Sequence, residues 1–350
     1  MPSGRYGGEA AVNEPPGIDL AGLTGWLTAR FPDGPEQTPE VRVIAGGRSN
    51  LTYEVVHDGR SMVLRRPPLG HVLATAHDMH REYTVLTALA PTPVPVPRTL
   101  AYCADPAVIG APFYLMEKVD GVIYRDAAAL RGLGAEAGQA LGYALADTLA
   151  ALHSVDPDNV GLADFGRPEG FLDRQIRRWR KQLAASYTRP LPGAEELAER
   201  LAGTVPTSGR PAVVHGDFRL DNTLVDPGAP GRIAAVLDWE MSTLGDPLTD
   251  LGITCVYWDG LDDLGPGVPP SPGNLPGWPS RAELVSRYAG RSGVEVGALD
   301  WYVAFGYFKL AVILEGIYCR HAQGLTVGAG FDLIGAAVPK LFARGHATLG

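Results

Sequence analysis

The stretch VVHGDFRLDNTLV, residues 213–225, constrains the fold more than any other part of the sequence. It places Asp217 two residues after His215 and five before Asn222, and apolar runs lie on both sides of these polar groups. After the short turn DPGAPG, the segment RIAAVLDWE supplies another apolar run, and the two runs together predict a hairpin. The sequence therefore predicts a tight polar loop that leads into a hairpin, with Asp238 at the end of its second strand.

The spacing of these polar groups indicates a particular chemistry. Asp217 and Asn222 are five residues apart, the interval between the aspartate and the asparagine of the protein-kinase catalytic loop. There the aspartate accepts the proton of an incoming hydroxyl, and the asparagine reaches a magnesium ion on the ATP phosphates. A second carboxylate must hold the metal, so we expect Asp217 to be catalytic and Asn222 and Asp238 to bind magnesium. The alternative is a polar turn whose side chains satisfy backbone amides.

The order of the predicted elements divides the chain into three parts. Residues 1–37 form a flexible Gly- and Pro-rich leader and a first helix. Residues 38–117 contain the strand-like segments VRVIAG, LTYEVVHDG and SMVLRRPP, then a helix over 77–90, then a hairpin from LAYCAD and APFYLMEKV. Residues 118–350 are mainly helical and include the polar loop. This order predicts an α+β chain with a small antiparallel-sheet lobe and a larger, mainly helical lobe.

HGDFRLDN followed by LDWEMSTLGDPLTDLG closely resembles the aminoglycoside phosphotransferase family. That family has a two-lobed protein-kinase-like fold and includes kinases of choline, homoserine and fructosamine-type small molecules. The resemblance covers roughly residues 40–340. The motifs GGRSNLTYEV, VLRRPP, HREYTVL and LHSVDPDNVGLADFG are most similar to the branch that is fused, in animals, to acyl-CoA dehydrogenase domains. The resemblance implies an ATP-dependent phosphotransferase with an alcohol acceptor, which uses ATP and Mg as cofactors.

The resemblance also implies where the nucleotide phosphates bind. Gly46 and Gly47 correspond to the family's nucleotide-covering loop, in which small residues let backbone amides approach phosphates. Ser49 and Asn50 are expected to contact phosphates from the same loop. A Gly-Gly pair is common in ordinary turns, so it is weak evidence without its position before the first hairpin.

Kinases also need a cation on the third strand, paired with a carboxylate on the following helix. Here MVLR stands where VAIK is expected, so Arg65 replaces the usual lysine and Glu82 is its expected partner. No lysine precedes position 118, and arginine at this place matches the branch named above. Strand alternation puts Val63 on the same face as Arg65, where it is expected to cover adenine. The alternative is a solvated strand residue and a surface helix charge.

The segment that follows the second hairpin is expected to join the two lobes. There the backbone of Glu117 and Val119, flanked by Met116 and Lys118, is expected to hydrogen-bond adenine. This expectation depends on position alone, because backbone groups leave no sequence pattern.

Other polar residues near the motif are expected to be structural. The resemblance implies that Asp246 buttresses the catalytic loop and that Asp250 supports the start of a helix. His215 is expected to organise the loop by hydrogen bonding rather than to act as a base, and His153 is also expected to be structural. Supporting residues of this kind often resemble catalytic ones in sequence.

A basic helix, FLDRQIRRWRKQ, carries the prediction about the acceptor. Arg174, Arg177, Arg178 and Lys181 recur at intervals of three and four residues and predict one basic face. In the family's fold, helices of this region help to wall the acceptor pocket. Such a wall favours an anionic acceptor, with a hydroxyacyl-CoA as first choice, and disfavours polycationic aminoglycosides. The alternative is a solvated face of a surface helix.

Composition and missing motifs exclude several other classes. The net charge of −9 argues against a general nucleic-acid binder. Residues 301–318 are apolar, but Lys309 and Glu315 interrupt them, so we expect a buried helix and no membrane span. The three cysteines lie far apart, which fits a reducing, cytoplasmic location without zinc or disulfides. Neither GxxxxGK[ST] nor GxSxG occurs, which excludes a Walker-type ATPase and a typical serine hydrolase.

Two rival functions are left beside a small-molecule kinase acting on a hydroxyl. The first is a pseudokinase-like module that binds nucleotide or acyl-CoA without transferring phosphate, suggested by Arg65 in place of lysine. Against it, Asp217, Asn222 and Asp238 are all present. The second is a kinase of aminoglycosides or other amino alcohols, which the basic helix disfavours.

Overall fold

The computed structural model of the chain describes residues 15–32, 37–44, 50–69, 77–262, 264–265, 271–324 and 331–350. The chain divides into two compact units, which we describe separately. Unit 1 comprises Met1–Thr84 and Arg98–Lys118, and unit 2 comprises Val85–Pro97 and Val119–Gly350.

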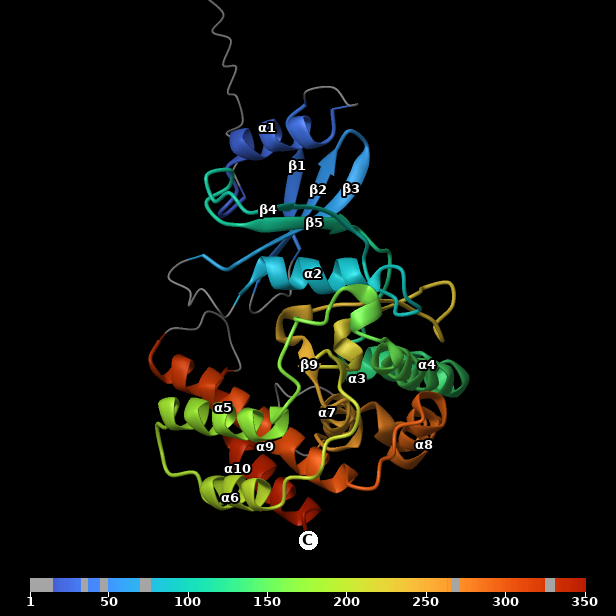
Figure 1. The fold of residues 1–350 in the computed structure, drawn as a ribbon, viewed down its shortest axis with the longest axis vertical. Helices are drawn as coiled ribbons and strands as arrows, with labels where there is room; N and C mark the ends of the chain where they lie inside the picture. Colours follow the sequence, from blue (N-terminus) through green and yellow to red (C-terminus); the bar gives the residue numbers. More distant parts are fainter. Residues whose placement is uncertain are drawn as a thin grey trace, which may run out of the picture. The chain divides into compact units, whose positions relative to one another are not determined.

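Unit 1 is built on a five-stranded antiparallel sheet with the strand order β1-β2-β3-β5-β4 (Figure 1). Its elements are α1 (Leu20–Arg30), β1 (Glu40–Val43), β2 (Leu51–His57), β3 (Arg60–Arg66), β4 (Thr99–Cys103), β5 (Phe113–Glu117) and the first part of α2 (Met79–Leu89), which continues into unit 2 from Val85. The predicted order of three strands, a helix and two strands is therefore confirmed. Asp58 and Gly59 both adopt positive φ between β2 and β3, as the tight turns of antiparallel hairpins require.

The core of unit 1 forms where α1 covers the sheet. Leu23 and Leu27 of α1 pack with Tyr53 of β2 and with Phe113 and Leu115 of β5, all fully buried. The phenol of Tyr53 donates a hydrogen bond to the backbone of the segment before α1. This packing fixes the sheet on which the residues expected to bind nucleotide are arranged.

Unit 2 is mainly helical and contains two small antiparallel strand pairs, β6 with β9 and β7 with β8. Its α-helices are α3 (Ala127–Gly132), α4 (Gly134–Ser154), α5 (Phe171–Ala185), α6 (Ala194–Gly203), α7 (Leu248–Asp259), α8 (Arg281–Ser292), α9 (Leu299–Ala322) and α10 (Phe331–Thr348). Its strands and short helices are η1 (Asp158–Val160), β6 (Ala212–Val214), η2 (Leu220–Asn222), β7 (Thr223–Val225), β8 (Ile233–Val236), η3 (Trp239–Met241), β9 (Thr243–Gly245) and η4 (Pro272–Asn274). The β7–β8 pair is the predicted hairpin.

Helix α9 lies at the centre of unit 2, where α5, α6, α7 and α10 pack against it (Figure 1). Gly252 of α7 permits the close approach of α9, because a Cβ there would lie 2.4 Å from the carbonyl oxygen of Tyr302. Within the described residues α9 is long and apolar enough to cross a membrane, but 78% of its most apolar window is buried inside the fold. It is therefore the buried core helix that the sequence predicted.

Two further local features accord with the sequence. The Ser280 side chain caps α8, and the Glu283 carboxylate accepts a hydrogen bond from the Ser280 backbone amide, which completes a capping box. Cys103, Cys255 and Cys319 are all buried free thiols, as expected for a chain without a disulfide framework.

Candidate active site

The cation and carboxylate predicted in unit 1 form an ion pair. The Nε atom of Arg65 on β3 lies 3.1 Å from Oε2 of Glu82 on α2, and Glu82 is only 1% exposed. The same carboxylate accepts hydrogen bonds from Tyr114 Oη at 2.9 Å and from Asn50 Nδ2 at 2.8 Å. Each carboxylate oxygen therefore accepts a neutral donor, which fixes the orientation of Glu82 and, through it, of Arg65.

The Asn50 side chain is engaged within unit 1, and the phosphate contact predicted for Asn50 stays a prediction. Its amide nitrogen donates to Glu82, and its oxygen lies 2.8 Å from Nδ1 of His77. Because that oxygen can only accept, Nδ1 of His77 carries the proton, and burial lowers the pKa of His77. The side chain of Asn50 is buried and engaged on both sides. Gly46, Gly47 and Ser49, the other predicted loop residues, lie outside the described residues.

Val63 and Arg65 lie on one face of β3, opposite Met116 and Tyr114 of β5. The ion pair uses Nε of Arg65, whereas a guanidinium carries its other four N–H groups on the two terminal nitrogens. That fork suits a phosphate better than a point charge does. Contact of Val63 with adenine and of Arg65 with phosphates stays a prediction.

The backbone predicted to bind adenine is partly engaged within unit 1. The Glu117 amide donates to the Arg98 carbonyl at 2.9 Å, and the Glu117 side chain accepts from the Arg98 amide. The Lys118 ammonium pairs with Glu54 at 2.7 Å. Val119, the next residue, begins the second part of unit 2. The adenine contacts predicted for Glu117 and Val119 therefore do not include the Glu117 amide.

In unit 2 the predicted catalytic loop, residues 215–222, follows β6 and requires glycine at position 216. Gly216 has a φ of +89°, and a Cβ there would lie 2.7 Å from Cβ of Met241. The loop then turns into η2 and β7, so Asp217 and Asn222 leave one tight bend. Nδ2 of Asn222 donates to the Asp217 backbone oxygen at 2.9 Å and to Oδ2 of Asp217 at 3.2 Å. The two side chains predicted to act together are therefore adjacent.

Asp250 of α7 holds this loop from beneath. Its Oδ2 accepts the His215 amide at 2.7 Å, and its Oδ1 accepts the Gly216 amide at 2.8 Å. His153 Nε2 of α4 lies 3.3 Å from Oδ2. Burial alone would raise the pKa of Asp250, but the hydrogen bonds from His153 and from the His215 amide lower it. Asp250 is therefore an ionised clamp on the catalytic-loop backbone.

The roles predicted for the two aspartates of LGDPLTDLG are exchanged in the structure. Asp246, expected to buttress the catalytic loop, instead accepts the Leu248 amide at 3.0 Å and the Tyr302 hydroxyl at 2.8 Å, so it caps α7. Asp250, expected to support the start of a helix, instead holds the catalytic loop. The physical reason is position: Asp246 precedes the first turn of α7, where amides lack partners, and Asp250 lies within the helix.

The two histidines are structural, as predicted. His215 is fully buried, its Nε2 lies 2.9 Å from the Leu237 carbonyl, and its Nδ1 accepts the Asp217 amide at 3.2 Å. The ring therefore links the catalytic loop to the segment that carries Asp238. Nδ1 of His153 lies 2.7 Å from the Tyr288 hydroxyl, so His153 ties α8 to Asp250.

The β7–β8 hairpin brings Asn222 and Asp238 to the same end. Thr223 pairs with Val236, and the Leu237 amide donates to the Asn222 carbonyl at 2.8 Å. Asp238 has a φ of 67°, a left-handed conformation uncommon for residues other than glycine and often found at functional sites.

This hairpin end fits a magnesium ion held in the kinase manner. Nδ2 of Asn222 is turned to Asp217, so its Oδ1 is the atom that can reach a metal. In the described part of the chain no three His, Cys, Asp or Glu side chains cluster for a metal. Magnesium needs no such cluster, because it is usually held by one or two protein oxygens together with substrate phosphates and water. Asn222 and Asp238 would supply such oxygens, and their binding of magnesium stays a prediction.

Arg219, within the same loop, was not singled out from the sequence. It pairs with Asp221 at 3.2 Å and with Oδ2 of Asp217 at 3.5 Å, and it lies over the Tyr257 ring at 4.6 Å. Burial would lower the pKa of Arg219, but Tyr257 and the carboxylates of Asp217, Asp221 and Asp238 raise it. A fixed cation therefore stands beside Asp217. The sequence could have indicated this role of Arg219, because Arg219 lies inside the motif HGDFRLDN.

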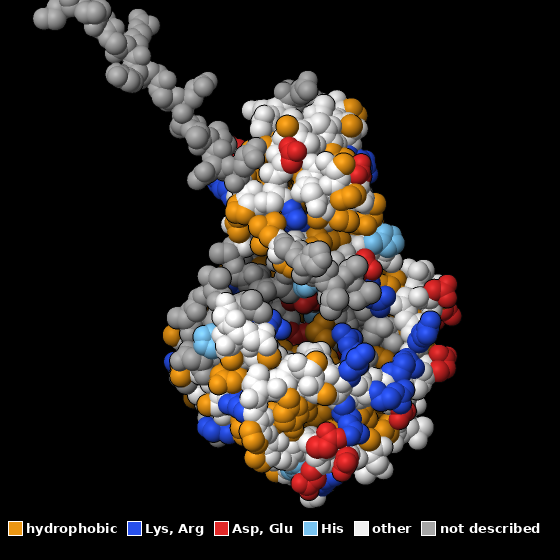
Figure 2. All heavy atoms as spheres, turned by 90° about the vertical axis from the view of Figure 1, so that its left-hand side faces the viewer, with side chains coloured by type: hydrophobic (Ala, Val, Ile, Leu, Met, Phe, Trp, Pro, Cys, Tyr) orange, Lys and Arg blue, Asp and Glu red, His pale blue; other side chains and the backbone are white. Residues whose placement is uncertain are grey.

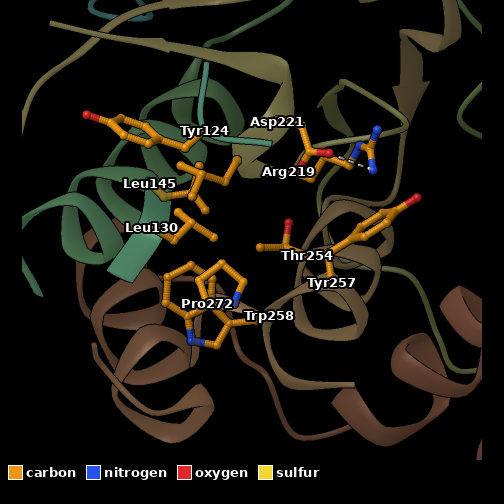
Figure 3. A pocket seen from close by; sticks show the side chains of 10 residues that line it. Tyr124, Leu130, Leu145, Arg219, Asp221, Thr254, Tyr257, Trp258 and Pro272 are labelled. Carbon is orange, nitrogen blue, oxygen red and sulfur yellow. Dashed lines mark ion pairs between the residues drawn. The ribbon is translucent and has the colours of Figure 1, made fainter. Parts of the chain in front are cut away.

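A small pocket adjoins this loop (Figure 3). The Arg219–Asp221 ion pair lies on one side of it, and Leu130, Leu145 and Trp258 supply apolar walls. Burial raises the pKa of Asp221, an effect that Arg219 opposes. The pocket has room for about one water molecule, so it is too small for a substrate.

The basic residues predicted to bind the acceptor lie on α5, and they differ in surroundings. Figure 2 faces the side of unit 2 on which Figure 1 places α5, and Lys and Arg side chains gather there. Arg174 donates to the backbone carbonyls of Arg167 and Glu169, which commits it to the preceding loop. Arg177 and Lys181 are exposed. Arg178 is exposed too, and its guanidinium lies 5.4 Å from the Trp179 ring centre.

Lys309 of α9, a second residue not singled out for function, joins α5 to the catalytic loop. It is only 8% exposed, its ammonium donates to the Gly216 carbonyl, and it lies 5.5 Å from the centre of the Trp179 ring. The sequence could have indicated a special role for Lys309, because it is a lysine within an otherwise apolar helix.

Comparison with known proteins decides the family. A model of the phosphotransferase enzyme family, APH, matches residues 40–284. The chain belongs to this family. Among solved structures, a Ralstonia eutropha protein provisionally named an aminoglycoside phosphotransferase is 34% identical with a TM-score of 0.82, over 95% of this chain and 98% of that one. The choline kinase of Cryptosporidium parvum, 15% identical, has a TM-score of 0.64 over 95% of both chains. The predicted α+β, protein-kinase-like fold is therefore confirmed.

Curated relatives of this chain are longer proteins. Acyl-CoA dehydrogenase family member 11 of Gallus gallus is 40% identical over 303 residues, which cover 84% of this chain and 38% of that protein. Family member 10 of Mus musculus is 38% identical over 286 residues, covering 81% of this chain and 27% of that protein. The phosphotransferase thus spans roughly a third of the relatives that it matches. The predicted similarity to this branch is confirmed.

Proposed function

We propose that this phosphotransferase uses Mg-ATP to phosphorylate the hydroxyl of a small anionic molecule, with a hydroxyacyl-CoA as the first choice. One observation carries the proposal: Asp217 and Asn222 leave one tight loop side by side, and the following hairpin brings Asp238 to the same end. These are the groups that phosphoryl transfer needs, because its catalysis consists mainly of positioning and charge stabilisation.

Asp217 orients the acceptor hydroxyl and takes its proton. Its side chain is 25% exposed, so a substrate can reach it, while Asn222 fixes one of its oxygens. Burial and the charge of Asp217 raise the pKa of the Tyr257 phenol, so Tyr257 stays protonated near this carboxylate. Arg219 supplies a permanent positive charge beside the transferred group.

Asn222 and Asp238 would hold the magnesium ion. When bound, magnesium neutralises charge on the phosphate oxygens and aligns them with the acceptor. Arg65 binds phosphate oxygens with its terminal nitrogens, and Glu82 keeps it in place. Because the Arg65–Glu82 pair is formed and buried, the exchange of lysine for arginine does not favour a pseudokinase over an enzyme.

The charge of α5 supports an anionic acceptor. Its fifteen residues include five basic side chains and one acidic side chain, and Lys309 adds a cation between α5 and Gly216. A polycationic aminoglycoside would be repelled, whereas the phosphates of coenzyme A would be attracted. The names of the curated relatives, acyl-CoA dehydrogenase family members 10 and 11, agree with a CoA-linked substrate. Three buried free thiols agree with a cytoplasmic location.

A panel of acceptors tests the proposal. ATP consumption should be measured with hydroxyacyl-CoAs, free hydroxy acids and aminoglycosides, and each product should be identified by mass. We expect phosphorylated hydroxyacyl-CoA and no phosphorylated aminoglycoside. Nucleotide binding without transfer to any member would support the pseudokinase instead.

A calorimetric experiment tests the metal site. ATP titrations with and without magnesium should show that Asp238→Ala weakens the effect of the metal on ATP binding, and identical metal dependence in variant and parent would remove Asp238 from the site.

A further inference from the structure

The ammonium of Lys309 makes fewer hydrogen bonds to the described residues than it has donors. It has three N–H donors, yet it makes one hydrogen bond, to the Gly216 carbonyl. Its other neighbour is the face of the Trp179 ring. Lys309 is only 8% exposed, so water reaches its remaining N–H donors poorly. A buried charged group that lacks hydrogen-bond partners is energetically costly.

Trp179 shows the same deficit. The residue is 2% exposed, and in the described part of the chain its indole Nε1 is buried without a hydrogen-bond partner. An indole nitrogen can only donate. Two neighbouring side chains, one on α9 and one on α5, thus hold unused donors and offer no acceptor.

The charges that face Lys309 come from three other elements. Asp217 of the catalytic loop and Asp250 of α7 attract its ammonium, and Arg178 of α5 repels it. Asp250 is already occupied by the His215 and Gly216 amides. Asp217 is the group expected to bind the acceptor hydroxyl. The unused donors therefore belong to the surroundings of that hydroxyl.

We infer that Lys309, assisted by Trp179, binds an oxygen of the acceptor that lies a few atoms from the hydroxyl to be phosphorylated. The inference rests on the proposed function. Donors alone select an acceptor-only group, which is a carbonyl or carboxylate oxygen and not an amine. Lys309 is thereby a specificity-determining residue: it favours hydroxy acids or their thioesters over plain alcohols and amino alcohols.

Two matched pairs of acceptors test this inference and distinguish a thioester from a carboxylate. The first pair is a hydroxyacyl-CoA and the corresponding thioether of CoA, which lacks only the carbonyl oxygen. The second is a free hydroxy acid and the corresponding diol. The parent should prefer the member that carries the carbonyl or carboxylate in at least one pair by about tenfold to a hundredfold in kcat/KM, the contribution of a hydrogen bond to a charged group.

Lys309→Met should abolish this preference; because it also frees the Gly216 carbonyl, any fall in kcat should be the same for both members of a pair. Trp179→Phe keeps the aromatic ring, removes only the indole N–H, and should reduce the preference by a smaller factor; it also tests the inference if Lys309→Met fails to fold. Lys340→Met, at an exposed position of α10, is the control and should keep the parent's preference.

The results distinguish a failure of the inference about Lys309 from a failure of the proposed function. If Lys309→Met and Trp179→Phe lower kcat for both members of a pair equally and keep the preference, Lys309 only supports the loop and the inference is wrong. A parent that turns over both members without preference also overturns the inference and leaves the proposed function standing. A parent that phosphorylates no member of either pair overturns the proposed function and the inference with it.

Discussion

The Arg65–Glu82 network of unit 1 and the catalytic loop of unit 2 are held in different ways. In unit 1, neutral donors from Asn50 and Tyr114 hold a side chain, the Glu82 carboxylate, and that carboxylate orients a cation. In unit 2, charged side chains hold the backbone: Asp250 binds the amide of Gly216, and Lys309 binds its carbonyl.

This difference explains why the unit 1 network tolerates a substituted cation, whereas the catalytic loop of unit 2 does not tolerate a changed backbone. In unit 1 the fixed element is the carboxylate, so either arginine or lysine can be placed against it. In unit 2 the chain path itself is fixed at both backbone groups of Gly216, its amide and its carbonyl, so Asp217 can leave the loop in only one direction. We therefore expect substitutions in the loop to have larger effects than substitutions in the unit 1 network.

The largest effect is expected for Asp217→Asn. It removes the base and leaves the loop backbone intact, so turnover should fall by about 10²- to 10⁴-fold, while ATP binding and melting temperature change little. Acceptor phosphorylation measured by product mass checks this. Asp226→Asn, in the exposed turn of the β7–β8 hairpin, is the control and should keep parental turnover. Near-parental turnover in Asp217→Asn would show that Asp217 is not the base.

The next effect is expected for Asp250→Ala. It strips the buried His215 and Gly216 amides of their acceptor and leaves His153 without its partner, which should lower the free energy of unfolding by about 3–5 kcal/mol. Urea denaturation measures this loss. Asp246→Asn, which retains an oxygen to cap α7, is the comparison and should cost less. Equal losses would contradict the assignment of Asp250 as the clamp.

A smaller effect is expected for Arg65→Lys. Lysine can still pair with Glu82 but lacks the fork of terminal nitrogens, so the KM for ATP should rise about tenfold while the fold is kept. Arg65→Ala should cost more, and Arg60→Lys, exposed on the same strand, should cost nothing. Higher activity in Arg65→Lys than in the parent would show that the network is built for lysine and would reverse the comparison.

The smallest effect concerns pH and unit 1. Burial lowers the pKa of His77 below its ordinary value of 6.5, so the unfolded chain takes up the proton first as the pH falls. Stability should therefore be full above pH 6.5 and should decline as the pH drops through it. His77→Gln should flatten the dependence of the melting temperature on pH, whereas His80→Gln, exposed on α2, should not. A parental slope in His77→Gln would exclude His77 as a source of the dependence.

Local features of the structure could be predicted from the sequence. The strand order of unit 1, the Asp58–Gly59 turn, the α8 capping box and the β7–β8 hairpin all depend on neighbouring residues, and all are found. The pairing of Asp217 with Asn222 also depends on a short interval. The ion pair of Arg65 with Glu82 could be anticipated because the kinase pattern fixes both places.

Contacts between distant residues could not be predicted in the same way. The Lys309–Gly216 hydrogen bond joins residues 93 positions apart, and Asn50 reaches Glu82 across 32 positions. No local pattern specifies such pairs, because they arise from the packing of whole elements. The exchanged roles of Asp246 and Asp250 are different, since Asp246-Pro247 before a helical run is itself a capping signal that the sequence contained.

The most direct test of the central claim follows the γ-phosphate of ATP. ATP labelled in that group should be incubated with magnesium, the parent chain and a hydroxyacyl-CoA, and in parallel with the acyl-CoA that lacks the hydroxyl. The label should appear as one phosphoryl group on the hydroxyacyl-CoA alone, and Asp217→Asn should nearly abolish it. Label released only as inorganic phosphate, or ATP left intact with every acceptor, would contradict the account.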